Sequence, residues 1–273
     1  MIQTIFKRLA PAAALAGAAL LGGCDGMNIQ FGDSEGVTLS ELDMTGAAPT
    51  ELVLAGPDNV VVTRGDALEI DVSGDQEAVD ALRFALDENM LAIHREKDSW
   101  SDKGVATVRV TMPELREITL AGSGSVQAER MEPRSAVTVA GSGSVTLAEV
   151  GPERFDATIA GSGDLEVSGT VERLELTIAG SGEARMAGLN AERAEVTVAG
   201  SGDAEFSSDG TVEASIAGSG DINVRGSATC SASKVGSGSL TCRGRSARSE
   251  APGAPEPPSA PQVPEAPQAP GDS

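Results

Sequence analysis

The chain has few aromatic and few basic side chains. Its 273 residues include no Tyr, one Trp and five Phe, and 20 Lys and Arg stand against 41 Asp and Glu, a formal net charge of −21. Nucleic acids are bound through clusters of Lys and Arg and by stacking of bases on aromatic rings, and this composition offers neither. It also disfavours charge-driven contact with anionic lipid headgroups and sugar sites built on aromatic rings. We therefore expect no nucleic-acid partner.

Histidine and cysteine are scarce as well. His94 is the single histidine, and it lies in an alternating, strand-like run that begins at Leu91, which is typical of a surface position. We predict no catalytic residue, no cofactor and no enzymatic activity. Of the three cysteines, Cys230 and Cys242 flank the last repeat described below. They are either a disulfide pair, as an oxidising periplasm permits, or two buried free thiols.

The beginning of the chain has the pattern of a bacterial lipoprotein signal. Lys7 and Arg8 precede an apolar, Ala-rich run over residues 9–21, and two glycines then lead to Cys24. The run is shorter than the ~20 residues of a membrane-spanning helix, and small residues before a cysteine resemble the lipobox. We predict a signal peptide over residues 1–23, lipidation of Cys24 and a tether over residues 24–36. A core thiol at Cys24 is the alternative.

This reading places the protein in the bacterial cell envelope. The lipid would hold it on the periplasmic side, at either the inner or the outer membrane, so the membrane is a partner only through the N-terminal lipid. At the other end, residues 247–273 are rich in Pro and poor in large apolar side chains. We predict a disordered, polyproline-like tail there, with a spacer or wall-reaching arm as the alternative.

The tripeptide Gly-Ser-Gly recurs seven times between these ends. Successive first glycines are 19, 20, 19, 20, 18 and 18 residues apart. They are Gly122, Gly141, Gly161, Gly180, Gly200, Gly218 and Gly236. A unit of this length with one apolar face cannot bury that face alone, so the repeats must stack on one another.

Apolar residues alternate with one parity on both sides of each tripeptide. The positions two and four before the first glycine, and four and six after it, are apolar in nearly every repeat, as at Val137, Val139, Val145 and Leu147. Alternation with period two is the pattern of strands with one buried face. In the last repeat Lys234 occupies one of these inward positions, so we expect the final coil to meet water.

The opposite parity carries small and hydroxylated side chains. Thr or Ser stands three before the first glycine, Ala stands one before it in six repeats, and Ser lies between the two glycines. The candidate interaction face comprises Thr138, Ala140, Ser142, Thr158, Ala160, Ser162, Thr177, Ala179, Ser181, Thr197, Ala199 and Ser201.

One acidic row lies three residues after the first glycine. Its members are Asp164, Glu183, Asp203 and Asp221. Like charges stacked at strand spacing repel each other, and a bound Ca²⁺ would relieve that repulsion. We interpret the row as a solvated edge without a metal, with a calcium site as the alternative.

These patterns predict an all-β fold, a parallel β-helix (β-solenoid) of about seven to eight coils with like residues stacked ~4.8 Å apart. Antiparallel hairpins with Gly-Ser-Gly at each tip are the alternative. The apolar spacing around Gly56 indicates a further, degenerate coil. Strands over residues 37–44, 67–72 and 105–112, with a short helix over 76–82, would complete an atypical N-terminal cap.

The chain resembles the head GIN domain family of adhesin-like bacterial envelope proteins. The segments that carry the likeness are Val72–Asp75 (VSGD), Met90–Ile93 (MLAI), Val108–Leu115 (VRVTMPEL) and Leu120–Gly124 (LAGSG). The resemblance implies a right-handed β-helical domain, over residues 37–246 here, in an exported protein. It supplies no catalytic residues.

The sequence thus favours a non-catalytic envelope lipoprotein that serves as an adhesion, scaffolding or protein-interaction module. Its partner would be an envelope protein or a polysaccharide, and the Thr-Ala-Ser face could also pack against a second copy. The alternatives are a β-helical enzyme that acts on polysaccharides, which would need clustered carboxylates in a cleft, and an ice-binding protein that orders water on its Thr rows.

Overall fold

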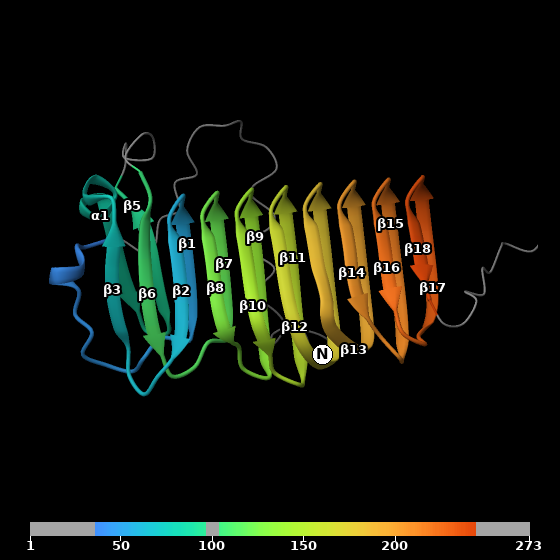
Figure 1. Cartoon of the computed structure of the whole chain (residues 1–273), viewed down its shortest axis with the longest axis horizontal. Helices are drawn as coiled ribbons and strands as arrows, with labels where there is room; N and C mark the ends of the chain where they lie inside the picture. Colours follow the sequence, from blue (N-terminus) through green and yellow to red (C-terminus); the bar gives the residue numbers. More distant parts are fainter. Residues whose placement is uncertain (1–35, 97–103, 244–273) are drawn as a thin grey trace, which may run out of the picture.

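The structure, a computed structural model, describes residues 36–96 and 104–243. Within these ranges the chain forms eighteen strands, one α-helix and one 3-10 helix. The strands make a flattened solenoid whose coils follow one another along one axis (Figure 1). The predicted signal peptide, Cys24 and the Pro-rich tail lie outside the described residues. No helix in the described part is long and apolar enough to cross a bilayer.

The elements are short and closely spaced. In chain order they are η1 (Leu39–Glu41), β1 (Glu51–Gly56), β2 (Asn59–Arg64), β3 (Glu69–Gly74), α1 (Gln76–Ala81), β4 (Leu82–Asp87), β5 (Met90–Arg95), β6 (Ala106–Met112), β7 (Glu117–Gly122), β8 (Ser125–Arg130), β9 (Arg134–Gly141), β10 (Ser144–Val150), β11 (Arg154–Gly161), β12 (Asp164–Gly180), β13 (Glu183–Gly200), β14 (Asp203–Ser207), β15 (Thr211–Gly218), β16 (Asp221–Arg225), β17 (Thr229–Gly236) and β18 (Ser239–Cys242).

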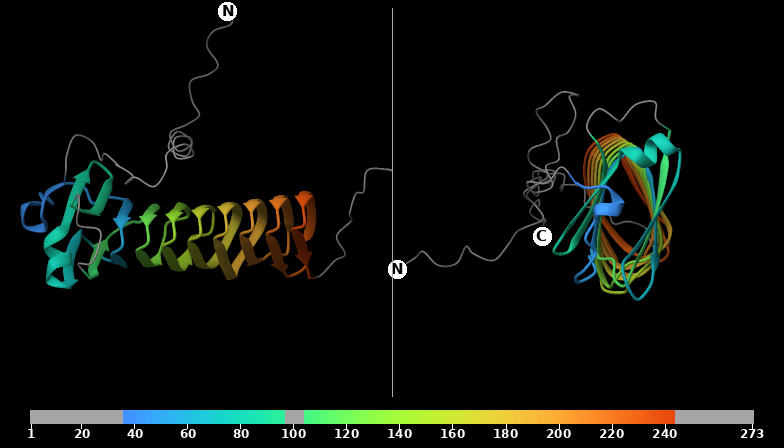
Figure 2. Two further views of the ribbon diagram at one scale, coloured as in Figure 1. Left: turned by 90° about the horizontal axis from the view of Figure 1, so that it is seen from above. Right: turned by 90° about the vertical axis from the view of Figure 1, so that its left-hand side faces the viewer.

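Each coil gives one strand to each of two facing stacks. Stack A runs β4, β5, β1, β7, β9, β11, the C-terminal parts of β12 and β13, β15 and β17. Stack B runs β3, β6, β2, β8, β10, the N-terminal parts of β12 and β13, β14, β16 and β18. The end-on view in Figure 2 shows the two stacks facing each other across a narrow interior.

The pairing between coils is parallel and places like residues on like residues. Gly141 pairs with Gly122 and Gly161, and Thr158 pairs with Thr138 and Thr177. The predicted parallel β-helix is therefore confirmed, and the hairpin alternative is wrong. The solenoid is described as having about six turns, slightly fewer than the seven to eight coils predicted.

The core is a set of apolar ladders between the two stacks. Residues of the predicted inward parity are buried along the rod, as Ile118, Val139, Ile159 and Leu165 show. Each coil except the last adds a similar layer, so burial of apolar surface is spread along the axis and is the main source of stability.

The tripeptide needs glycine at both ends because consecutive corners touch. A Cβ at Gly161, whose φ is +124°, would lie 2.5 Å from the carbonyl oxygen of Gly141. A Cβ at Gly163 would lie 2.7 Å from the carbonyl oxygen of Gly143. Both distances are shorter than real Cβ contacts. The motif is thus a structural corner, where the backbone turns from stack A to stack B.

The N-terminal end is built from chain that doubles back. The degenerate coil β1–β2 stacks directly on β7 and β8, as the spacing around Gly56 predicts. The coil β5–β6 follows it in sequence but lies on its outer side. Beyond that coil, β3 and β4 pair antiparallel with β6 and β5. Helix α1 joins these two edge strands and buries Ala78 and Ala81.

Two predictions for this cap need correction. Residues 37–44 do not form a strand: they contain η1, and only Val37 pairs, with Phe84 of β4. Leu39 and Leu42 of this segment pack against the core, whereas Val37 and Met44 are exposed, so the apolar residues do not share one buried face. The strand β4 was not predicted, because residues 82–87 follow the predicted helix without an intervening turn signal.

A buried ion pair lies inside the cap. Asp58 stacks in register with the second glycine of the repeats, so its side chain enters the interior at the first corner. Arg95 donates hydrogen bonds to both carboxylate oxygens, at 2.8 and 2.7 Å, and the amide of Ala106 donates a third. Both side chains are 1% exposed. The hydrogen bonds to Asp58 raise the pKa of Arg95 above its ordinary value, which keeps the pair charged.

Candidate functional site

The outer surface of stack A carries four parallel rows of side chains. The Thr and Ala rows of the candidate interaction face both lie here, with Thr197 and the alanines at positions 160, 179 and 199 exposed. The Ser row lies at the corner next to them, also exposed. The structure therefore brings all twelve predicted residues onto one continuous strip.

Beside the Thr row lie two charged rows that the sequence reasoning missed. An acidic row contains Asp156, Glu175, Glu195 and Glu213, and an arginine row contains Arg134, Arg154, Arg173 and Arg193. They stand five and seven residues before the first glycine, at the same outward parity as Thr. Comparing the repeats at the next two outward positions, five and seven residues before the first glycine, would have found both rows.

These charged rows are linked by exposed ion pairs. Arg154 binds Asp156 of its own strand and Glu175 of the next coil, each at 2.7 Å, and the hydrogen bond to Asp156 raises the pKa of Arg154. Arg134 binds Glu153 at 2.6 Å. Exposed pairs of this kind contribute roughly 0–1 kcal/mol each. These pairs place a row of negative and a row of positive side chains next to each other on the outer surface of stack A.

The acidic row considered for calcium lies on the outer surface of stack B. Protein groups engage its carboxylates: Asp203 accepts a hydrogen bond from the amide of Asp221 at 2.8 Å, and Asp221 accepts from the amide and hydroxyl of Ser239 at 3.0 and 2.7 Å. Arg185 binds Glu183 at 2.6 Å and lies 3.7 Å from Asp164. Among the described residues, no group of three acidic, His or Cys side chains is arranged to hold a metal. Asp203 and Asp221 instead accept hydrogen bonds that link adjacent coils.

An open hollow lies where the repeat length changes. It measures about 360 Å³ and is lined by Asn190, Glu192, Arg193, Asp209, Gly210 and Thr211. The repeat that starts at Gly180 is 20 residues long and the next is 18, so the turn within β13, around Asn190, has two more residues than the turn after β14. The hollow forms a ledge along the edge of the rod where the chain turns from stack B to stack A.

His94 lies in the N-terminal cap at the register position of the Ala row, because it pairs with Ala55, which in turn pairs with Ala121. It is half-buried on β5, and its Nδ1 is 3.1 Å from the carbonyl oxygen of Arg95. The predicted strand at this position is confirmed by β5, but its burial does not alternate, since Leu91, Ala92 and Ile93 are all buried.

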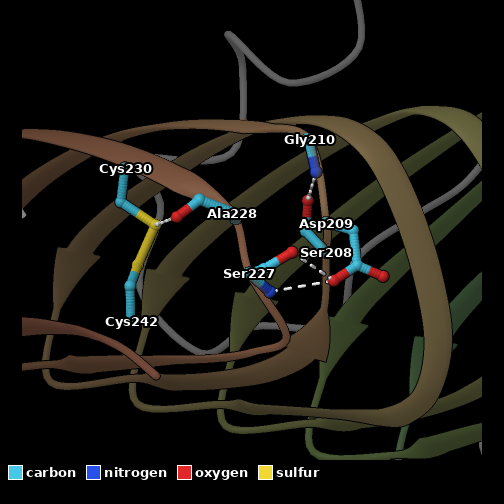
Figure 3. The surroundings of a disulfide bond; sticks show 7 residues. All are labelled: Ser208, Asp209, Gly210, Ser227, Ala228, Cys230 and Cys242. Atoms are coloured by element: carbon cyan, nitrogen blue, oxygen red, sulfur yellow. Dashed lines mark hydrogen bonds between the residues drawn. A yellow bond between two sulfur atoms is a disulfide. The ribbon is translucent and has the colours of Figure 1, made fainter. Parts of the chain in front are cut away.

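At the opposite end, a disulfide joins Cys230 of β17 to Cys242 of β18 (Figure 3). It links stack A to stack B across the interior of the last coil. In the same region Asp209 accepts hydrogen bonds from the amide and hydroxyl of Ser227, at 2.8 and 2.9 Å. These contacts lower the pKa of Asp209 below its ordinary value. The last coil is thus tied both across the rod and to the coil before it.

Solved structures share this architecture. A protein described as a "putative lipid binding protein" from Parabacteroides distasonis is 26% identical, with a TM-score of 0.57, over 72% of this chain and 93% of its own. A "putative adhesin" from Bacteroides fragilis is 22% identical, with a TM-score of 0.65, over 71% and 92%. Another from Parabacteroides merdae is 16% identical, with a TM-score of 0.54, over 71% and 92%. The last two likenesses concern the fold alone.

No curated protein sequence matches the chain significantly. The family model described as "putative auto-transporter adhesin, head GIN domain" matches residues 48–228. This range begins just before β1 and ends just before β17, so it covers β1 to β16 and omits η1 and the last coil. The chain therefore belongs to the head GIN domain family of adhesin-like proteins.

Proposed function

We propose that this protein is a non-catalytic adhesion or scaffolding module of the bacterial envelope, held at the membrane by a lipid on Cys24. The observation that carries the proposal is the repetitive rod, whose described surface presents rows of like side chains in fixed register. Membership of an adhesin-like family supports it. A rigid face in fixed register suits binding to a surface better than turnover of a small substrate.

The placement of the two ends fits such an anchor. The described chain starts at Gly36 beside the cap and ends at Arg243 in the last coil, at opposite ends of the rod (Figure 1). Ten layers of strands at ~4.8 Å span about 43 Å. A lipid on Cys24 would therefore hold the capped end near the membrane and present the stack surfaces and the last coil away from it.

The anchor is tested by the variant Cys24→Ser. Cells that produce the full chain are grown with a labelled fatty acid, and the labelled protein is followed in the membrane fraction. We expect loss of label and release from membranes for Cys24→Ser, while Cys230→Ser keeps both. Label that persists without Cys24 would refute the lipid anchor.

The interaction face is tested by the triple variant Ala160→Lys, Ala179→Lys, Ala199→Lys. The matched control carries Thr146→Lys, Thr170→Lys and Asn223→Lys, which are exposed positions outside the face. Beads coated with each mature chain are incubated with isolated envelopes. We expect at least a tenfold loss of binding for the face variant only, with unchanged circular dichroism. Equal binding by both variants would exclude this strip as the adhesive surface.

A further inference from the structure

The last coil leaves the solenoid open. Among the described elements, β17 pairs only with β15, and β18 pairs only with β16. One edge of each strand therefore presents backbone donors and acceptors to solvent. The side chains of this coil are exposed too: Val235 is 77% exposed, and Ala232 and Lys234 are exposed although both have the inward parity. An unpaired edge of this kind is a template for a further strand.

The charge of this end is opposite to that of the rest of the rod. Between Asp221 and Glu250 the chain has no carboxylate side chain, yet it has five basic residues, Arg225, Lys234, Arg243, Arg245 and Arg248. The acidic rows stop one coil before the end, where Glu213 stacks on Ser231 and Asp221 stacks on Ser239. Within the described part of the last coil, Lys234 and Arg243 are thus the basic side chains, and no side chain is acidic.

Lys234 gives this surface a specific feature. It stacks directly on Ile216, a buried residue of stack A. An apolar strand that extends the ladder would place its own inward side chain against the Lys234 ammonium group and bury the charge without a partner, which is costly. A strand with a carboxylate at that position would pair with it.

The disulfide keeps this edge in shape. Terminal repeats of a solenoid fray because they have only one neighbour. The bond between Cys230 and Cys242 holds β17 and β18 together across the interior. An incoming strand therefore meets an edge that is already ordered, which lowers the entropy cost of binding.

Two occupants from the chain itself fit poorly. The tail contains Pro at 252, 255, 257, 258, 261, 264, 267 and 270, and Pro lacks the amide hydrogen that a ladder requires. The stretch before Pro252 carries Arg245 and Arg248, which repel Lys234. A second copy docked end to end would bring two Lys234 side chains together.

We propose that the open edge of β17 is a docking site for an extended acidic segment of a partner protein, which adds as a further strand and sets a carboxylate against Lys234. The proposal goes beyond the adhesive strip on stack A and does not depend on the lipid anchor. It identifies the end of the rod opposite the cap as a second, independent recognition surface.

The test uses a blocked octapeptide with the sequence of Thr211–Gly218 in which Ile216 is replaced by Glu. A second peptide carries Lys at that position. Each is added at millimolar concentration to the full chain from residue 24, and binding is followed by fluorescence anisotropy and by amide hydrogen exchange of residues 229–243. We expect the Glu peptide to bind about tenfold more tightly than the Lys peptide and to slow exchange in β17.

Charge reversal on the protein provides the control. Lys234→Glu should reverse the peptide preference and Lys234→Gln should abolish it, each with an unchanged circular dichroism spectrum. Equal binding of both peptides, or no protection of β17, would overturn the proposal. So would protection that appears only after residues 250–273 are removed, because the tail would then be the occupant. Dimers in sedimentation with β17 already protected would identify a second copy instead.

Discussion

The two ends of the solenoid solve the same problem in different ways. A stack of parallel strands exposes a core layer and two strand edges wherever it stops. The N-terminal end covers them with antiparallel strands, helix α1 and a buried Asp58–Arg95 pair. The C-terminal end adds no element in the described residues and relies on a disulfide and an inward-facing Lys234.

The comparison shows where the specific information of this fold lies. The middle of the rod is repetitive, and each coil is stabilised by its two neighbours in the same way. Residues that do not follow the repeat are found at the two ends, because each terminal coil lacks a neighbouring coil on one side. Mutations in the two ends should therefore have different consequences, and the following experiments rank them.

The largest effect is expected from Arg95→Met in the cap. It leaves the carboxylate of Asp58 buried without its partner, which costs about 3–5 kcal/mol. The free energy of unfolding, measured by urea denaturation followed by circular dichroism, should fall by that amount. Arg116→Met removes an exposed pair with Glu114 and should cost less than about 1 kcal/mol. Similar losses for both variants would mean that the buried pair does not secure the cap.

The next effect is expected from Cys230→Ser with Cys242→Ser. The bond closes a loop of 12 residues in sequence separation, which corresponds to about 3 kcal/mol in the loop-entropy model. Because the coil is terminal, the loss should be local: amides of β17 and β18 exchange faster, while those of β4 and β5 do not change. Faster exchange along the whole rod would contradict the independence of the two ends.

Much of the middle of this molecule could be predicted from sequence, because the rows are set by parity alone. The corner glycines, the buried ladders and the Thr-Ala strip all follow from a strict period of two and a repeat near 19 residues. The cap could not be predicted in the same way. Its coil β5–β6 is placed outside β1–β2 by pairing between segments far apart in the chain, and Asp58 with Arg95 shows no local pattern.

A smaller, pH-dependent effect is expected from Glu117→Gln near the cap. Burial raises the pKa of Glu117 above its ordinary value of 4.5, and the neighbouring Glu51 adds to the shift. The fold thus favours the protonated carboxyl. This contribution is present at pH values below the ordinary pKa and is lost as pH rises through the raised one.

The neutral Gln side chain should therefore raise stability at pH 7 by a few tenths to about 1 kcal/mol and leave it unchanged at pH 3. Thermal melts at both pH values provide the measurement, with the exposed Glu129→Gln as the control. A gain at pH 3 equal to that at pH 7 would show that the effect is not due to charge.

The smallest change in stability is expected from Lys234→Ile at the open end. The substitution continues the apolar ladder above Ile216 at an exposed site, so the free energy of unfolding should change by less than about 0.5 kcal/mol. It also removes the positive charge that disfavours pairing of the open edge of β17 with another copy, so concentration-dependent association should appear in sedimentation velocity. Arg243→Ile, outside the ladder, serves as the control. A variant that stays monomeric would show that the charge of Lys234 does not prevent self-association.

The candidate site was predicted only in part, for a physical reason. Parity identifies which side chains point outward, but it cannot say which outward rows pair with each other. The hydrogen bond from Ser239 to Asp221 and the ion pair from Arg154 to Glu175 depend on which coil follows which. The ledge at Asn190 and Thr211 depends on a difference of two residues between adjacent repeats, visible in the spacing yet meaningful only once the coils are stacked.

The stacking of like on like makes the length of this protein an adjustable quantity. One more unit of 18–20 residues, inserted at any Gly-Ser-Gly corner, would find a matching surface above and below and would lengthen the rod by one step of ~4.8 Å. Neither end would need to change. The number of repeats thus sets the distance between the last coil and the cap, independently of what either end binds.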